Sequence, residues 1–276
     1  MYKRQINIEA IKKAQENGIN FIINTGREYP NARALVESAG LKCDLICSNG
    51  SCAFDKDGNL LFEHEIDKET IRKIFDAFNE YSMEPSLYTT EGRISLLPLE
   101  ERKIYTRDVF IPAIQVNHPD MEYTLDDFRE LVDNVIFVDG QEALLNSDHR
   151  ILKISSNSTD HEALKKLRVE LEKIPGLAVV STVPTDIEIT SVHAQKGSTL
   201  LDYAKRDGLT PDEIVAIGDS ENDYSMLSIP GIHSVAMENA CDMIRNICVY
   251  QTRANTRDGI AYIINCILAD RENFKL

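Results

Sequence analysis

Three acidic residues stand within five positions of the segment VAIGDSENDYSML, residues 215–227: Asp219, Glu221 and Asp223. They follow an apolar run that is typical of a buried strand and ends at Gly218. Carboxylates at the carboxyl end of such a strand suit a hard cation such as Mg²⁺, which proteins hold with one or two carboxylates plus phosphate oxygens. The alternative is a surface loop whose acids cap the next helix. The convergence of oxygens at a strand end favours a metal site.

A hydroxyl residue and a glycine follow another apolar run, at residues 19–24, in the motif NTGR. Thr25 and Gly26 would lie at a strand-to-helix turn, where a hydroxyl and free backbone N–H groups can bind a phosphate. Taken alone, the motif is more often a plain turn with a cap.

A lysine precedes the predicted helix 198–206, in the motif HAQKGSTLLDYAK. The ammonium group of Lys196 could lie over the mouth of the sheet and offset phosphate charge in a transition state. Taken alone, a lysine at this position is more often a solvated surface residue.

The elements around these motifs alternate between helices and strands. The apolar spacing predicts a helix over 7–17, a strand over 19–24, a helix from Pro30 to Gly40 and a strand over 44–50. Such alternation is typical of a doubly wound parallel sheet, an α/β fold. The same rhythm returns near Lys196. There it predicts helix 198–206, strand 214–217, helix 221–228, strand 232–237 and a helix around 257–269.

The middle of the chain has a different character. It mixes an amphipathic helix over 66–81 with alternating strands, which indicates an α+β insert. We therefore predict a core domain made of residues 1–61 and 185–276, interrupted by an inserted domain at 62–184. The other predicted elements of the insert are strand-like segments at 86–97, acidic helices near 124–133 and 140–146, strand 151–156, helix 160–173 and two short strands, LAVVS and DIEIT.

Composition excludes several classes of partner. The 276 residues carry a net charge of -15, which argues against nucleic-acid binding because phosphate backbones are bound by clusters of Lys and Arg. No apolar stretch is long enough to span a membrane, and residues 1–10 lack the apolar run of a secretory signal. The six cysteines form no C-x-x-C pair and are expected to be free thiols. We expect a cytoplasmic protein without membrane or nucleic-acid partners; its oligomeric state cannot be read from the sequence.

Taken in order, NTGR, a lysine followed by glycine, and GDSENDYSML resemble the motifs of the haloacid dehalogenase superfamily of phosphatases, and most closely its Cof-type branch. The resemblance includes the segments 48–66, 235–240 and 254–268, and therefore extends over nearly the whole chain. The insert at 62–184 stands where that branch carries its cap domain.

The resemblance implies a Mg²⁺-dependent hydrolysis of small phosphorylated metabolites in two steps. An aspartate attacks the phosphoryl group, an aspartyl phosphate forms, and water then releases phosphate. On the matching positions, Asp219 would hold Mg²⁺ directly with Asp223 supporting it, and Lys196 would stabilise the charge. The expected phosphate and substrate contacts are Thr25, Gly26, Asn49 and Asn222.

The nucleophile of this family belongs to a D-x-D-G-T motif after the first strand, upstream of the helix that here begins at Asn7. Residues 1–6 contain no acid. The segment DKDGN, residues 55–59, joins two short apolar runs through Asp-Gly, which is typical of a hairpin. We therefore expect that this chain lacks the nucleophile and the first central strand, with a gap between the strands at 19–24 and 214–217.

Two functions from different classes remain open. One is a magnesium-dependent phosphatase whose nucleophile lies outside this sequence, and the other is a non-catalytic protein that binds a phosphorylated ligand. A dinucleotide-binding oxidoreductase ranks far behind, because no G-x-G-x-x-G follows a strand. The sequence does not identify the substrate among sugar phosphates, nucleotides and vitamin phosphates.

Overall fold

The chain forms two units in this computed structural model, which describes residues 5–270. The core unit comprises Met1–Arg27, Asn31–Phe62 and Gln195–Leu276, and the insert unit comprises Glu28–Pro30 and Glu63–Ala194. All helices and strands predicted for the core unit are present, with ends within three residues of the predicted ones. No helix in the described part of the chain combines the length and apolar character that crossing a bilayer requires.

The strands of the core unit form two sheets. In the first, β1 pairs in parallel with β2, and β2 pairs antiparallel with β3. In the second, β12 pairs in parallel with both β11 and β13. The fold is α/β, as predicted, but the sheets are mixed: β3 runs antiparallel to β2 because the tight turn after β2 reverses the chain. The strands are β1 (Ile22–Asn24), β2 (Asp44–Cys47), β3 (Cys52–Phe54), β4 (Leu60–Glu63), β11 (Val215–Gly218), β12 (His233–Ala236) and β13 (Tyr250–Gln251).

The strands β1 and β11 belong to different sheets. β1 is the first strand in the order β1-β2-β3-β4, and β11 is the first in the order β11-β12-β13. Within residues 5–270, each of these two strands therefore has one edge that no other strand pairs with. These are the two strands between which the sequence predicted a gap.

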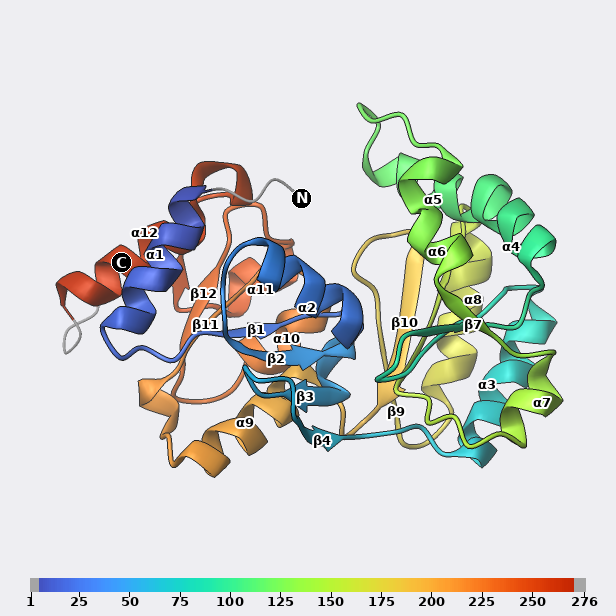
Figure 1. The fold of residues 1–276 in the computed structure, drawn as a ribbon, viewed down its shortest axis with the longest axis horizontal. Helices are drawn as coiled ribbons and strands as arrows, with labels where there is room; N and C mark the ends of the chain where they lie inside the picture. Colours follow the sequence, from blue (N-terminus) through green and yellow to red (C-terminus); the bar gives the residue numbers. More distant parts are fainter. Residues whose placement is uncertain (1–4, 271–276) are drawn as a thin grey trace. The chain divides into compact units, whose positions relative to one another are not determined.

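Helices cover both faces of the second sheet. On one face, Ile263 of α12 packs against Val235 of β12, and α1 lies beside α12 with Ala14 and Ala261 in one apolar cluster (Figure 1). On the other face, α9, α10 and α11 pack around Ala216. Successive strand residues point to opposite faces, which is why Val215 and Ala216 contribute to different clusters. The helices are α1 (Gln5–Glu16), α2 (Tyr29–Ser38), α9 (Lys196–Asp207), α10 (Tyr224–Leu227), α11 (Asp242–Ile247) and α12 (Gly259–Ala269).

The insert unit contains a six-stranded sheet with the order β7-β6-β5-β8-β10-β9. Its apolar face, which includes Leu87, Ile154 and Ile189, packs on α3 (Lys68–Glu80) and α8 (His161–Glu172). The alternate positions of the same strands are polar, as expected for a sheet whose second face carries no apolar layer. The strands are β5 (Ser86–Tyr88), β6 (Arg93–Ser95), β7 (Val135–Phe137), β8 (Lys153–Asn157), β9 (Leu177–Val180) and β10 (Asp186–Ser191).

Two features of the insert unit differ from the sequence analysis. The predicted boundary after residue 184 leaves β10 outside the insert, whereas β10 pairs with both β8 and β9, and the unit extends to Ala194. The helices between 98 and 117 were not predicted, because exposed apolar residues such as Ile104 and Val116 obscure the helical period. The remaining helices of this unit are α4 (Leu99–Tyr105), α5 (Ile111–Asn117), α6 (Arg129–Asp133) and α7 (Gln141–Leu145).

All six cysteines are free thiols, as predicted. Cys43, Cys47 and Cys52 are buried, and burial raises the pKa of Cys43 to about 11. Cys241 is exposed.

Candidate active site

The residues predicted to act on phosphate all lie in the core unit, at strand ends or at a helix start. Thr25 and Gly26 follow β1, Asn49 follows β2, and Lys196 is the first residue of α9. Because the carboxyl ends of parallel strands share one edge of a sheet, such positions collect around one point. The acidic loop after β11 supplies the others, which are Asp219, Asn222 and Asp223.

Lys196 and Asp223 form a buried ion pair. The Nζ atom of Lys196 lies 2.6 Å from Oδ1 of Asp223, and the two residues are 6% and 5% exposed. The exposure excludes the alternative of a solvated surface lysine. A buried pair of this kind is strongly coupled, since removing one partner leaves an uncompensated charge in the interior.

Two glycines make this pair possible. A Cβ on Gly197 would lie 2.1 Å from the carbonyl oxygen of Ser225, so only glycine allows the start of α9 to approach α10 this closely. The N–H of Gly197 uses the approach to donate to the hydroxyl of Ser225 at 3.1 Å. A Cβ on Gly218 would lie 2.5 Å from Cγ of Asp223, so the second glycine lets this carboxylate lie under the end of β11.

The second oxygen of Asp223 holds the acidic loop. Oδ2 accepts hydrogen bonds from the backbone N–H groups of Asp219, at 2.8 Å, and Ser220, at 3.1 Å. Both carboxylate oxygens of Asp223 are therefore engaged, one with Lys196 and one with the loop. Asp223 thus links the lysine to the loop, which is consistent with the supporting role that the resemblance implies.

Asp219 carries the more available carboxylate. Its Oδ1 accepts from the hydroxyl of Ser220 at 3.2 Å, and its Oδ2 accepts from the side-chain amide of Asn239 at 2.9 Å. No cluster of three or more His, Cys, Asp or Glu in residues 5–270 is arranged to hold a metal ion. The carboxylate of Asp219, supported by that of Asp223, does fit Mg²⁺, because this ion keeps waters and substrate phosphate oxygens as its other ligands.

A strained turn connects β2 to the rest of the site. Ser48 and Asn49 have φ values of 50° and 60°, a left-handed conformation that residues other than glycine adopt at a cost. Hydrogen bonds fix the turn, because the N–H of Asn49 donates to the carbonyl oxygen of Thr25 at 3.1 Å. The side chain of Asn222 donates to Oδ1 of Asn49 at 3.0 Å. The turn therefore joins the β1 end to the acidic loop.

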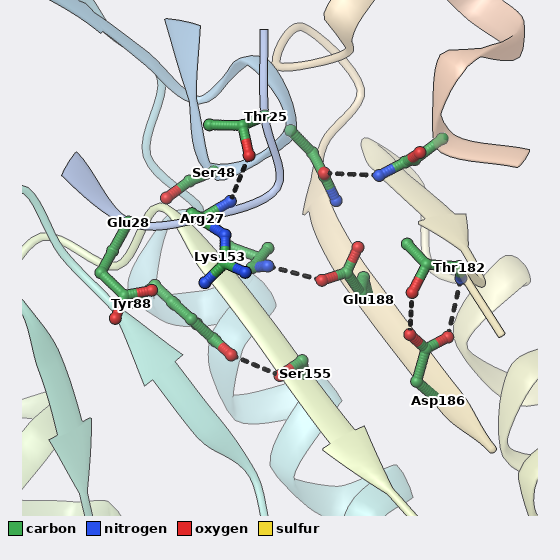
Figure 2. Close-up of polar contacts among 12 residues, drawn as sticks. Thr25, Arg27, Glu28, Ser48, Tyr88, Lys153, Ser155, Thr182, Asp186 and Glu188 are labelled. Carbon is green, nitrogen blue, oxygen red and sulfur yellow. Dashed lines mark hydrogen bonds and ion pairs between the residues drawn. The ribbon is translucent and has the colours of Figure 1, made fainter. Parts of the chain in front are cut away.

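Thr25 lies in the turn that follows β1. Its hydroxyl accepts a hydrogen bond from the N–H of Arg27 at 3.2 Å, as Figure 2 shows. This bond orients the hydroxyl oxygen at the end of β1. The N–H of Thr25 donates to the carbonyl oxygen of Ile46 at 2.8 Å and continues the pairing with β2.

Two polar residues that the sequence analysis did not select lie next to selected ones. Oδ1 of Asn24 and the hydroxyl of Ser48 are buried without a hydrogen-bond partner among the described residues. The amide nitrogen of Asn24 donates to the carbonyl oxygen of Lys196 at 3.1 Å. Asn24 is the first residue of the NTGR motif, and Ser48 opens the segment 48–66 of the family resemblance. Asn239, the partner of Asp219, lies in the segment 235–240 of the same resemblance and was likewise not selected.

The segment DKDGN forms a hairpin turn, as predicted. Oδ1 of Asp55 accepts from the N–H groups of Asp57 and Asn59, at 2.9 Å and 2.8 Å. Asp57 pairs with Lys42 at 2.6 Å and is exposed. Both acids therefore have structural roles on the surface.

A separate polar cluster lies on the sheet of the insert unit. Lys153, 2% exposed, lies 2.5 Å from Glu188 and 4.3 Å from the ring centre of Tyr88, whose hydroxyl contacts Ser155 (Figure 2). Burial is the largest single effect and would lower the pKa of Lys153, but Glu188 and Tyr88 together outweigh it and the pKa is raised. Asp186 is the first residue of β10, the strand that carries Glu188. Its Oδ1 accepts a hydrogen bond from the backbone N–H of Thr182.

Comparisons with known proteins agree on one family. Residues 3–264 match the family described as haloacid dehalogenase-like hydrolase. The chain is 29% identical over 265 residues to the 5-amino-6-(5-phospho-D-ribitylamino)uracil phosphatase YwtE of Bacillus subtilis (strain 168), which covers 95% of this chain and 91% of that protein. It is 24% identical to the pyridoxal phosphate phosphatase YbhA of Escherichia coli (strain K12), over 94% of this chain and 89% of that one.

A solved structure shares the fold. The haloacid dehalogenase-like hydrolase from B. subtilis superposes with a TM-score of 0.79 at 24% identity, over 94% of this chain and 92% of that chain. The family match covers nearly the whole sequence and includes NTGR, Lys196 with its following glycine, and the acidic loop. The chain therefore belongs to the haloacid dehalogenase-like hydrolases, in their Cof-type phosphatase branch.

Proposed function

We propose that this protein hydrolyses small phosphorylated metabolites with Mg²⁺ and through an aspartyl-phosphate intermediate. The observation that carries the proposal is the buried Lys196–Asp223 pair, 2.6 Å long, in which Asp223 also accepts a hydrogen bond from the backbone N–H of Asp219. Burying a lysine and an aspartate together is costly, so their retention at a strand end favours a functional role.

Each predicted site residue in the core unit then has a proposed role that follows from its contacts. Lys196 offsets negative charge on the transferred phosphoryl group, and Asp223 keeps its ammonium in place. The hydroxyl of Thr25 and the N–H of Gly26 bind phosphate oxygens, while Asn222 and Asn49 orient the substrate as a bonded pair. Asp219, supported by Asp223, holds Mg²⁺, which when bound supplies positive charge to the phosphoryl oxygens.

We also propose that the nucleophilic aspartate lies on a strand that pairs between β1 and β11. Two observations support this strand. Both strands have an edge that no described strand occupies, and Thr25 and Asp219 follow their ends. Oδ1 of Asn24 is buried at the same place without a partner, and a backbone N–H of an added strand would satisfy it.

We further propose that the insert unit is the cap domain and that it selects the leaving group. The relatives named above are phosphatases of a ribitylaminouracil phosphate and of pyridoxal phosphate, and both names describe small phosphate esters. A phosphate ester of this size is the class of substrate proposed for this protein. A cytoplasmic location, with neither nucleic acid nor membrane as a partner, remains the prediction from composition.

The test compares two purified proteins with 4-nitrophenyl phosphate as substrate. One is the 276-residue chain, and the other is extended upstream in its own reading frame until an Asp-x-Asp-Gly-Thr motif is included. We expect turnover by the extended protein only, dependent on Mg²⁺ and lost with a chelator. In that protein Asp219→Ala should lower kcat at least ~10²-fold, while Asp202→Ala, exposed on α9, should not.

Other outcomes contradict the proposal. Turnover that is unaffected by a chelator or by Asp219→Ala excludes the metal role. A stop codon directly upstream, together with binding of inorganic phosphate but no hydrolysis, favours the non-catalytic binding protein. The specific observation behind that second function is the lack of an Asp-x-Asp-Gly-Thr motif in the 276 residues.

A further inference from the structure

A pocket in the insert unit carries polar groups that the proposed hydrolysis does not use. It lies between the residues that lead into β5 and the helices α4 and α6, and it opens to solvent. Figure 1 shows α4, α5 and α6 grouped at one end of this unit. All of its lining residues belong to the insert unit, and they include Glu84, Arg102, Leu97, Phe110 and Leu131.

Arg102 supplies an unmatched positive charge. The residue is 8% exposed, and its Nε and Nη1 atoms are buried without a hydrogen-bond partner among the described residues. Burial lowers the pKa of Arg102, and the charge of Asp133 offsets this effect only in part. The N–H groups of a guanidinium donate charge-assisted hydrogen bonds to a carboxylate. The pocket therefore offers a carboxylate a partner that the protein itself does not provide.

Glu84 supplies an unmatched acid in the same pocket. Its Oε1 atom is also buried without a hydrogen-bond partner in residues 5–270. Burial, with the like charge of Glu101, raises the pKa of Glu84 to about 7. Oε1 of Glu84 accepts no hydrogen bond from Nε or Nη1 of Arg102, although the two charges are opposite and both residues line one pocket. A buried acid in this state is stabilised by a cationic group brought close to it.

The rest of the lining mixes apolar and polar side chains. Leu97, Phe110 and Leu131 form walls that suit a hydrocarbon side chain. A second guanidinium in the lining, that of Arg93, pairs with Glu28 at 3.6 Å.

A ligand that matches Arg102, Glu84 and the apolar walls has a carboxylate, an ammonium group and an apolar side chain. We propose that this pocket binds a small zwitterion, an α-amino acid with an apolar side chain, with its carboxylate at Arg102 and its ammonium at Glu84. The proposal is independent of the hydrolytic function.

Calorimetric titration of the full chain tests it with three probes that differ in one group each. They are l-leucine, 4-methylpentanoate, which lacks the ammonium, and 3-methylbutylamine, which lacks the carboxylate. We expect l-leucine to bind and both analogues to bind at least ~10-fold more weakly, since each leaves one buried charge unmatched. Absence of binding by l-leucine, l-valine, l-methionine and l-phenylalanine at about 10 mM overturns the proposal. Equal affinity for 4-methylpentanoate also overturns it, because the pocket would then be an anion site.

Two variants with matched controls locate the ligand. Arg102→Gln and Glu84→Gln should each weaken l-leucine binding at least ~10-fold. Arg107→Gln and Glu100→Gln should not, because these side chains are 60% and 79% exposed on the same stretch of chain. Glu84→Gln removes a buried acid and is expected to fold even if Arg102→Gln does not, as melting followed by circular dichroism will show. Binding by Glu84→Gln that equals the wild type refutes the ammonium subsite.

Discussion

Replacing Gly197 by alanine tests whether the approach of α9 to α10 sets the geometry of the Lys196–Asp223 pair. In an ordinary helix this change stabilises by about 1 kcal/mol. Here the added Cβ would lie 2.1 Å from the carbonyl oxygen of Ser225, and real Cβ contacts are essentially never under 3.0 Å. The helices must therefore separate by about 1 Å, and the sign of the effect should reverse.

The expected magnitude follows from that displacement. Overpacking of this kind costs about 1–3 kcal/mol, so the free energy of unfolding of Gly197→Ala should fall by that amount. The same movement would lengthen the ion pair of Lys196, now 2.6 Å. A displacement of about 1 Å in a catalytic group can cost about 10²-fold in rate, so kcat should fall by that order.

Two measurements check the prediction. Urea denaturation followed by circular dichroism gives the stability, and Mg²⁺-dependent hydrolysis of 4-nitrophenyl phosphate by the upstream-extended protein gives kcat. Asp202→Ala, an exposed change on the same helix, is the control for helix propensity. If Gly197→Ala is as stable as that control and retains its kcat, the two helices do not need their close contact and the reasoning is refuted.

Three further changes have expected outcomes. Lys196→Met should lower the free energy of unfolding by about 3–5 kcal/mol because it leaves a buried carboxylate unpaired, whereas exposed Lys205→Met should change urea denaturation little. Burial and the charge of Glu188 raise the pKa of Asp186 from 3.8 to about 6, so the wild type should lose stability relative to Asp186→Asn as pH rises from 4 to 6. The loss is about 1.4 kcal/mol per pH unit in urea denaturation, and a constant difference would show that the carboxyl is not perturbed. Asp57→Asn should leave the turnover of the extended protein unchanged, because this side chain pairs with Lys42 on the surface; a loss of turnover would make Asp57 the nucleophile.

The sequence by itself determined the class of the fold and the places where chemistry could occur. Apolar runs that stop just before Thr25 and Asp219 predict buried strands. Burial imposes a pattern of apolar residues that is visible in a short stretch of sequence. Gly218 and the glycine after Lys196 were visible as parts of motifs. The family follows from the order of those motifs along the chain.

Tertiary structure alone decided how these residues work together. That Asp223 engages Lys196 with one oxygen and the acidic loop with the other depends on how α9 approaches α10. The bond between Asn222 and Asn49 joins residues 173 positions apart. No local window contains such information, since it arises from the packing of elements that are distant in the sequence.

In the insert unit, too, local sequence patterns predict some features and only the tertiary structure decides others. Helices such as α3 and α8 follow local patterns, but the placement of β10 between β8 and β9 is a long-range pairing that moved the boundary. Arg102 and Glu84 carry no motif at all. Their unmatched charges became visible only once α4 and the start of β5 were folded around one pocket, because burial is a property of the folded chain and not of the residue.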